Sequence, residues 1–421
     1  MFGLALAYLR DRWMTTALNV VLLGIAVATL VLLLLFSSQL ENRFERDARG
    51  IDLVVGAKGS PLQLILSSIY QVDMPTGNIP LSSVDLLRRD PGVARVVPVA
   101  LGDNFRGFRI VGTEPSYLGI YDAELGQGRM NKAVGEVLLG ATVARETGAK
   151  LGQKFLGSHG LGEGEGESEH GAHPFTTVGI LKPTGTVADR LILTSIESVW
   201  DVHGIEHDEE GMHAEAEHEA HGAGETHHDE PVLDARGELQ PEVTALLVSY
   251  RNASGAIRIP GMINRQTEMQ SAVPAIETAR LLTLFGSAIE GARIFAWLLA
   301  LTGGLSIFVA LLNQARAREG DLALLRVMGA TRSTVFGTIL LEGLVTAAAG
   351  VVLGLVLGHA LMWIAGRSFQ TLADIGLSAF NFHPGEVAIA AAVLGIGIVA
   401  ALLPAARVFR VDLARTLARA S

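Results

Sequence analysis

The amino-acid sequence predicts an integral membrane α-helical protein, with four transmembrane helices and a large α+β extracytoplasmic domain between helices 1 and 2. Of its 421 residues, 49% are hydrophobic and 18% are charged, and the mean hydropathy is +0.37. A soluble domain carries about 25% charged residues, so this chain is too apolar to be wholly soluble. The apolar residues gather in four long runs, and residues 37–285 separate the first two runs.

Each apolar run is long enough to cross a bilayer, because a helix rises about 1.5 Å per residue and the hydrocarbon core is about 30 Å thick. The predicted spans are residues 18–36, 294–312, 335–365 and 387–403. In the third span, Gly350, Gly354 and Gly358 form a ridge suited to close helix packing. Glu342 and His359 are the only ionisable residues within these spans, which argues against an ion path through them.

The first apolar run could also be a signal peptide, with Arg10 and Arg12 as its basic segment. The run from Leu18 to Phe36 is longer than the usual apolar segment of 7–15 residues, and no small-x-small cleavage site follows Phe36. We therefore expect an uncleaved membrane anchor.

Basic residues in short flanks predict which side of the membrane each loop faces, because cytoplasmic loops carry an excess of Lys and Arg. The arginine-rich flanks contain Arg10 and Arg12; Arg316, Arg318, Arg326 and Arg332; and Arg407, Arg410, Arg415 and Arg419. The loop 366–386 has only Arg367, beside Asp374 and Glu386. We expect cytoplasmic segments at 1–17, 313–334 and 404–421, and an inner (plasma) membrane location with residues 37–285 outside.

The predicted extracytoplasmic domain mixes strand and helix patterns, which is typical of an α+β fold. Short apolar runs bounded by Gly and Pro predict strands at 53–55, 93–99, 108–112, 136–140, 175–181, 191–194 and 243–250. Helices are expected at 82–89 and 142–147, with Ser82 and Asp85 as an S-x-x-D helix start. Beyond it, residues 286–312 are assigned to a stalk and the second span.

Residues 275–312 are expected to form one long helix that leads from the outer domain into the second span, because no proline or turn cluster follows Pro274. Such a helix could carry motion through the membrane. The alternative is a break near Gly286 or Gly291, since an interior glycine costs a helix about 1 kcal/mol.

The sequence carries no motif of an enzyme that binds nucleotide itself. G-x-x-x-x-G-K-[ST] is absent, and Gly56-Ala-Lys-Gly-Ser60 has the wrong spacing for a P-loop. H-E-x-x-H, G-x-S-x-G and G-x-G-x-x-G are also absent, and the chain has no cysteine, which excludes thiolate chemistry and a disulfide framework. We therefore predict no enzymatic activity in this chain, and nothing points to nucleic acid.

The net charge of −10 comes from two tracts rich in Gly, Glu and His, at residues 157–174 and 201–230. Together they hold 15 of the 43 acidic residues, 10 of the 12 histidines and no Lys or Arg. The rest of the chain has 33 basic and 28 acidic residues, so the acidity is local. Such compositions cannot bury enough apolar area to pack, and we expect loops.

The loop after the second span reads R-A-R-E-G-D-L-A-L-L-R-V-M-G-A-T at residues 316–331. It resembles the R-x-R-E-[IL]-A-L-L-R-x-[IM]-G-A-T loop of FtsX-like, MacB-type (type VII) ABC transporter permeases. The C-terminal P-A-A-R-V-F-R-V-D-L-A-R-T-L at 404–417 is similar to the ending of that class, with Leu413 in place of the usual proline. E-V-L-L-G at 136–140, L-G-Q-K at 151–154 and F-T-T-V-G-I-L at 175–181 resemble its outer domain.

The resemblance implies a permease subunit without ATPase activity, driven by a separate cytoplasmic ATPase. Two copies of an ATP-binding subunit would pair with two permease chains, most simply a homodimer, and a periplasmic adaptor or lipoprotein could join them. ATP would bind the partner subunit. Family members extrude drugs or peptides, extract lipoproteins or regulate cell-wall hydrolases, and the sequence does not choose among these. The expected ATPase-coupling residues are Arg318, Glu319, Leu322, Leu325, Arg326 and Gly329.

The coupling residues form an amphipathic pattern that suits the groove of a partner protein. Leu322, Leu325 and Met328 make an apolar stripe with charges around it, and Gly329 would end the helix with a positive φ. The alternative is a helix lying on the bilayer surface.

Histidine and carboxylate are common ligands of Zn²⁺ and other divalent metals, so the two tracts suggest metal binding. The candidate ligands are His159, His170, His173, His203, His207, His213, Glu217, His218, His221, His227 and His228. Protonation of these imidazoles near pH 6 would allow pH sensing instead. A solvated acidic loop is the third interpretation.

Two rival functions remain at this stage. One is a membrane-anchored extracytoplasmic protein that binds, senses or delivers a divalent metal. The other is a membrane-anchored zinc hydrolase, which is disfavoured because catalytic zinc needs a rigid shell of ligands.

Overall fold

The computed structural model describes residues 2–158, 174–202, 241–317, 327–368 and 378–407. The chain divides into two compact units: residues 1–42 with 282–421, and residues 43–281. The second unit falls within the segment 37–285 that was expected to form the outer domain.

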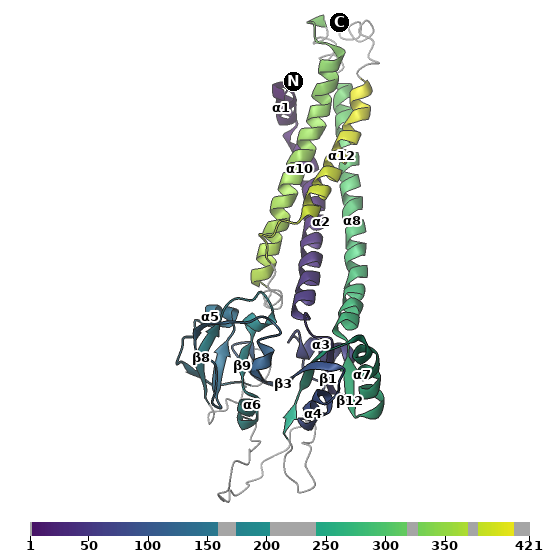
Figure 1. The fold of residues 1–421 in the computed structure, drawn as a ribbon. Helices are drawn as coiled ribbons and strands as arrows, with labels where there is room; N and C mark the ends of the chain where they lie inside the picture. The colour runs from purple at the N-terminus through teal and green to yellow at the C-terminus, as the bar shows by residue number, and fades with distance from the viewer. Residues whose placement is uncertain (1, 159–173, 203–240, 318–326, 369–377, 408–421) are drawn as a thin grey trace, which may run out of the picture. The chain divides into compact units, whose positions relative to one another are not determined.

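The first unit is built from helices (Figure 1). They are α1 (Phe2–Asp11), α2 (Trp13–Asp47), α8 (Pro274–Ala317), α10 (Arg332–Ser368) and α12 (Pro384–Arg407). Among the described residues, α2, α8, α10 and α12 are the helices long and apolar enough to cross a membrane. Each contains one of the predicted spans, so the prediction of four apolar membrane-length helices is confirmed.

Helix α8 is continuous over 44 residues, as predicted, and passes through Gly286 and Gly291 without a break. At 1.5 Å per residue it is about 66 Å long, roughly twice the thickness of the hydrocarbon core. The boundaries between the two units fall within α8 and within the 35-residue α2.

The predicted glycine ridge of α10 (Gly350, Gly354 and Gly358) packs against α2. The side chains nearest to the ridge are those of Leu23, Val27 and Val31, one helical turn apart. A Cβ added at Gly354 would lie 2.4 Å from the Cβ of Val27, which is closer than two carbon atoms can approach. The absence of side chains on the ridge therefore allows the two helices to touch, as in small-xxx-small interfaces.

The second unit is organised around one mixed sheet of ten strands within the described residues. Its strands are β1 (Leu53–Ala57), β3 (Val93–Phe105), β4 (Phe108–Thr113), β5 (Leu125–Gly128), β6 (Glu136–Leu139), β7 (Lys154–Phe155), β8 (Phe175–Leu181), β9 (Ile192–Thr194), β11 (Ala245–Tyr250) and β12 (Met269–Ala272). The order is β12-β1-β11-β3-β4-β9-β6-β8-β5, with β7 also paired to β8. The pairs β4–β9 and β6–β8 are parallel.

A two-stranded sheet and short helices complete the second unit. The strands are β2 (Ile79–Pro80) and β10 (Glu242–Val243). The helices are α3 (Pro61–Ser68), α4 (Ser82–Arg88), η1 (Pro115–Tyr117), α5 (Ala141–Thr147), η2 (Val187–Arg190), α6 (Ile196–Val202) and α7 (Ala253–Gln266). The predicted α+β fold is confirmed.

Both faces of the large sheet are buried along β1. Val54 belongs to one hydrophobic cluster, whereas its neighbours Leu53 and Val55 belong to a second. A strand that is covered on both faces is apolar at every position, which is why residues 53–55 read as a continuous apolar run. At β8 the pattern alternates between buried and partly exposed residues.

The seven predicted strand regions and both predicted short helices are present, but one prediction about a helix start is wrong. Ser82 does not cap α4, because the N-cap is Leu81 in the αR conformation and no side chain caps the helix. The helix does begin at Ser82, as the predicted range 82–89 has it, so the Ser82 hydroxyl lies inside the first turn and not at the cap. Sequence patterns also missed α1, α3, α6, α7 and the strands β5, β7 and β12.

Candidate functional site

The end of α2 lies inside the second unit and is referred to here as the α2 foot (residues 43–47). Asp47 is its last residue and is 2% exposed. A carboxylate at a helix C-terminus faces the negative end of the helix dipole and is destabilised there. The Arg43 Nε, 2.9 Å from Asp47 Oδ2 and one turn earlier, offsets that cost with an ion pair.

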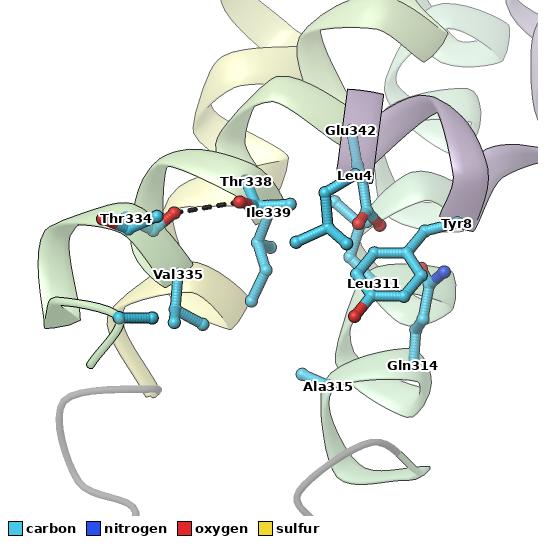
Figure 2. Close-up of a pocket in the computed structure, with 11 residues that line it drawn as sticks. Leu4, Tyr8, Leu311, Gln314, Ala315, Thr334, Val335, Thr338, Ile339 and Glu342 are labelled. Atoms are coloured by element: carbon cyan, nitrogen blue, oxygen red, sulfur yellow. Dashed lines mark hydrogen bonds between the residues drawn. The ribbon is translucent and has the colours of Figure 1, made fainter. Parts of the chain in front are cut away.

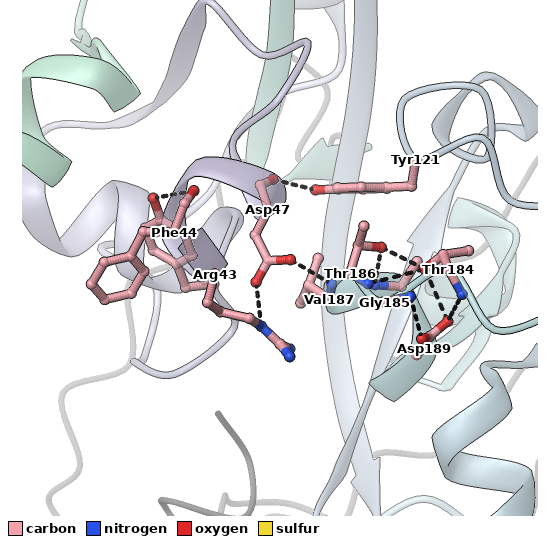
Figure 3. Close-up of polar contacts among 11 residues, drawn as sticks. Arg43, Phe44, Asp47, Tyr121, Thr184, Gly185, Thr186, Val187 and Asp189 are labelled. Carbon is pink, nitrogen blue, oxygen red and sulfur yellow. Dashed lines mark hydrogen bonds and ion pairs between the residues drawn. The ribbon is translucent and has the colours of Figure 1, made fainter. Parts of the chain in front are cut away.

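The Asp47 carboxylate also reaches a distant part of the chain (Figure 3). Its Oδ1 accepts a hydrogen bond of 2.8 Å from the backbone N–H of Val187, the first residue of η2. The backbone carbonyl of Asp47 accepts a hydrogen bond of 3.2 Å from the Tyr121 hydroxyl. The α2 foot is therefore joined to η2 by a charge-assisted hydrogen bond, a strong type of contact when buried.

The turn that precedes η2 is held rigidly by Asp189. Its Oδ1 accepts from the backbone N–H of Thr184 at 2.7 Å, and its Oδ2 accepts from that of Gly185 at 2.8 Å. Gly185 has a φ of +73°, a conformation that glycine adopts at low cost. The turn and η2 together connect β8 to β9 of the large sheet.

Tyr70 links the α2 foot to the start of α8 within the second unit. Its hydroxyl lies 2.7 Å from Thr278 Oγ1 and donates at 3.3 Å to the backbone carbonyl of Phe44. The rings of Phe44 and Tyr70 pack with centroids 4.7 Å apart. Burial raises the pKa of Tyr70 to about 12, so the hydroxyl stays neutral at physiological pH.

Of the predicted coupling residues, only Gly329 belongs to the described part of the chain. Its φ of +101° agrees with the predicted positive φ. Arg318, Glu319, Leu322, Leu325 and Arg326 lie outside the described residues. Val327 and Met328, which adjoin them, are 64% and 69% exposed, so large apolar side chains are presented at this turn.

A cavity of about 80 Å³ lies beside this turn in the first unit. Residues of three helices line it, as Figure 2 shows: Leu4 and Tyr8 of α1; Leu311, Gln314 and Ala315 of α8; and Thr334, Val335, Thr338, Ile339 and Glu342 of α10. Glu342 is 2% exposed. Sequence reasoning missed α1, although Leu4 and Tyr8 at i and i+4 were an available signal of a helix with an apolar face.

All eleven candidate metal ligands lie outside the described residues. Among the residues that the structure does describe, no group of three or more His, Asp or Glu could hold a metal ion. The structure does describe the residues next to each tract, and their contacts show where the tracts leave the domain. Ser158 exchanges backbone hydrogen bonds of 2.8 and 2.9 Å with Asn104, and Val202 packs on the cluster that contains Phe155 and Phe175. One end of each tract therefore adjoins the same hydrophobic cluster.

Four membrane-length helices and an α+β domain carried between the first two define a multi-pass membrane protein with an extracytoplasmic domain. Two family profiles match the sequence: the FtsX-like permease C-terminal at residues 293–413 and the MacB-like periplasmic core domain at residues 16–220. The chain therefore belongs to the FtsX-like, MacB-type permeases, the membrane components of type VII ABC transporters. Permeases of this family normally work with a cytoplasmic ABC ATPase.

Two solved structures are similar to the outer domain. One is the periplasmic region of MacB from Actinobacillus actinomycetemcomitans, at 11% identity and a TM-score of 0.34, covering 56% of this chain and 95% of that one. The other is the extracellular domain of the noncanonic ABC-type transporter YknZ from Gram-positive bacteria, at 12% identity and a TM-score of 0.30, covering 53% and 98%. No curated protein matches the chain.

Proposed function

We propose that this chain couples ATP hydrolysis by a separate cytoplasmic subunit to movement of its own outer domain. The observation that carries the proposal is the buried junction at the α2 foot, where Asp47 bonds Val187 and Arg43. Tyr70 ties the same foot to Thr278 of α8. Both helices that leave the membrane for the outer domain are thus joined to it by specific hydrogen bonds.

Rigid contacts at the foot are what mechanical transmission requires. An α-helix is stiff along its axis, and its displacement reaches the domain only where its end is bound. The Asp47 bond acts on η2, between β8 and β9, which lie in the large sheet. Export, extraction and signalling at the outer domain are all compatible with this coupling.

At the other end of the bundle, we assign the ATPase contact to residues 318–329. The exposed Val327 and Met328 support an apolar docking surface there. The arginine-rich flanks support a cytoplasmic position for this loop and for both termini. The working complex is two such chains with two ATP-binding subunits, with an adaptor or lipoprotein as a further partner.

The test is ATPase stimulation by the full chain in lipid nanodiscs, with the ATP-binding subunit that co-purifies with it. The double variant Glu319→Lys, Leu325→Asp is expected to abolish stimulation while the chain remains folded. The matched control makes the same kind of change on the outer domain, with Lys150→Glu and Leu151→Asp, both at exposed positions. Unchanged stimulation by the first variant contradicts the proposed contact.

A second function, extracytoplasmic capture of a divalent metal, is favoured by the shared position of the tract flanks at one cluster. The histidines of both tracts would then supply one site. The test compares Zn²⁺ bound per full chain in detergent with that of a variant in which the ten tract histidines are Gln. Replacement of His359 and His383 by Gln is the control. Equal binding by all three proteins rejects metal capture.

A further inference from the structure

A second pocket lies in the first unit, where residues 378–383, which precede α12, meet α2. Gln39 of α2 holds Ser378 by two hydrogen bonds: its Nε2 donates to the Ser378 carbonyl at 2.9 Å, and its Oε1 accepts from the Ser378 N–H at 2.7 Å. Gln39 follows the predicted first span by three residues, or about 5 Å along the helix. The pocket therefore lies near the outer boundary of the hydrocarbon core, on the side of the extracytoplasmic domain.

One wall of the pocket is fixed by His359. Its Nδ1 lies 2.7 Å from the carbonyl oxygen of Ala379, which can only accept, so Nδ1 carries a proton. Its Nε2 lies 3.0 Å from Glu386 Oε2, and the Glu386 side chain is 1% exposed. Both ring nitrogens are engaged, so His359 offers an occupant the surface of its ring and no free N–H group.

The remaining wall is largely apolar. The pocket has a volume of about 560 Å³ and is lined by His359, Ala360, Trp363, Ala379, Phe380 and Phe382. The aromatic side chains there are far from buried: Phe380 is 87% exposed and Phe382 is 65% exposed. Aromatic residues at this depth are typical of the membrane interface, where the neighbouring molecules are lipids.

A positively charged side chain, that of Arg367, lies beside the pocket. The Arg367 guanidinium carbon lies 4.5 Å from the centroid of the Trp363 ring, one turn further along α10. This cation–π contact holds an exposed positive charge near an apolar pocket. A hydrophobic chain with an anionic group at its end matches that combination, whereas a cationic or purely apolar ligand would leave the charge unused.

We propose that this pocket binds one acyl chain of an anionic phospholipid from the outer leaflet, with the lipid phosphate at Arg367. The volume and the apolar lining of the pocket suit the acyl chain, and the charge of Arg367 selects the headgroup. Attraction of an anionic membrane surface is worth about 1 kcal/mol per Lys or Arg, which corresponds to about a fivefold change in binding. The proposal is independent of the ATPase coupling.

The test uses the full chain in vesicles of phosphatidylethanolamine with a phosphatidylglycerol that carries a photoreactive group on its acyl chain. Peptide mapping is expected to place the label on residues 359–363 and 378–382. Phe380→Ser with Phe382→Ser should remove most of that label, and Phe380→Leu with Phe382→Leu should retain it. Arg367→Gln should lower it about fivefold. The same change should lower labelling by photoreactive phosphatidylcholine by less, because the choline cation of that lipid already balances its phosphate.

Two controls separate a specific site from ordinary lipid contact. Phe295, 61% exposed in the middle of α8, is replaced by Ser in one control variant, and Arg293, two residues earlier, is replaced by Gln in another. Neither change should alter the label at the pocket. Label spread along all helices and insensitive to Phe380 and Phe382 would overturn the proposal. Cross-links from the pocket to a second copy of the chain in place of lipid would overturn it as well.

Discussion

The Asp47 carboxylate at the end of α2 accepts a hydrogen bond of 2.8 Å from the backbone N–H of Val187, 140 residues later in the chain. This contact joins the end of the first membrane-length helix to η2, which lies between β8 and β9 in the chain. Because Asp47 is buried and also pairs with Arg43, its loss would leave both the Val187 N–H and the Arg43 guanidinium without that partner.

Replacing Asp47 by Ala is therefore expected to loosen η2. Leaving a buried donor unsatisfied costs about 1–3 kcal/mol, so amide exchange of the peptide that spans residues 184–190 should accelerate about tenfold in native-state hydrogen exchange. Glu45→Ala, two residues away and exposed, is the control and should leave exchange there unchanged. Equal exchange in the Asp47→Ala variant and the original protein would remove the physical basis for transmission through this junction.

Tyr70→Phe should weaken the link between the α2 foot and α8 without disturbing the ring packing on Phe44. Loss of the hydroxyl contacts to Thr278 and the Phe44 carbonyl is expected to cost about 1 kcal/mol of unfolding free energy. Tyr250→Phe is the contrasting variant, because the buried Tyr250 hydroxyl has no hydrogen-bond partner within the described part of the chain. Tyr250→Phe should leave the free energy of unfolding unchanged or raise it. A similar loss of unfolding free energy in both variants would contradict the assigned role of Tyr70.

The pKa of Tyr70 gives the same link a pH dependence. Burial raises it from 10 to about 12, so the folded state favours the neutral hydroxyl. The stability that the neutral Tyr70 hydroxyl contributes to the folded state is fully present below about pH 10 and is lost as the pH rises toward about 12. The stability difference between the original protein and Tyr70→Phe should therefore shrink over this range, as measured by chemical unfolding at a series of pH values.

Glu136, at the start of β6, is expected to make the stability of the protein depend on pH at acidic values. Hydrogen bonds from the Arg129 guanidinium and then from the Lys132 N–H lower its pKa from 4.5 to about 2. Its stabilising contribution is present above the unfolded value and is lost as the pH falls from about 4.5 toward about 2. Glu136→Gln should flatten that part of the stability profile, by a small amount because the Arg129 side chain of the pair is 54% exposed to solvent. An unchanged profile between pH 2 and 5 would show that the ion pair does not contribute.

Local sequence patterns predicted the parts of the fold that depend on local composition. The four membrane-length helices follow from runs of apolar residues, and the strands follow from short Val, Ile and Leu runs such as 53–55. Helix α7 was missed because Gly255, Pro260 and Gly261 within its 14 residues are residues that oppose helices in isolation. Packing of Ile259 and Ile263 in the core stabilises it nevertheless.

The junction at the α2 foot could not be predicted from the sequence. Asp47 and Val187, and likewise Tyr70 and Thr278, are more than a hundred residues apart, and no spacing rule connects them. The candidate coupling residues, in contrast, came from resemblance to family motifs and from an amphipathic pattern. Of these, Gly329 alone could be compared with the structure, and its positive φ agrees with the expectation.

The glycine ridge of α10 gives the most specific mutational prediction, because a pattern seen in the sequence coincides with a close helix contact in the structure. A methyl group at Gly354 would lie 2.4 Å from Val27 Cβ and 2.8 Å from the Gly24 carbonyl oxygen. The helices would have to separate, and such overpacking costs about 1–3 kcal/mol. Gly354→Ala is therefore expected to lower the thermal midpoint of the detergent-solubilised chain.

Gly395→Ala in α12 is the matched control, since among the described residues no atom outside its local backbone lies within 4 Å of the added methyl group. Alanine is favoured over glycine in a helix by about 1 kcal/mol, so this variant should be neutral or slightly stabilised. Opposite changes in thermal stability on the same Gly→Ala substitution would show that contact between α10 and α2, not helix propensity, requires glycine at position 354. A loss of stability of equal size in both variants would mean that the ridge does not hold the two helices together.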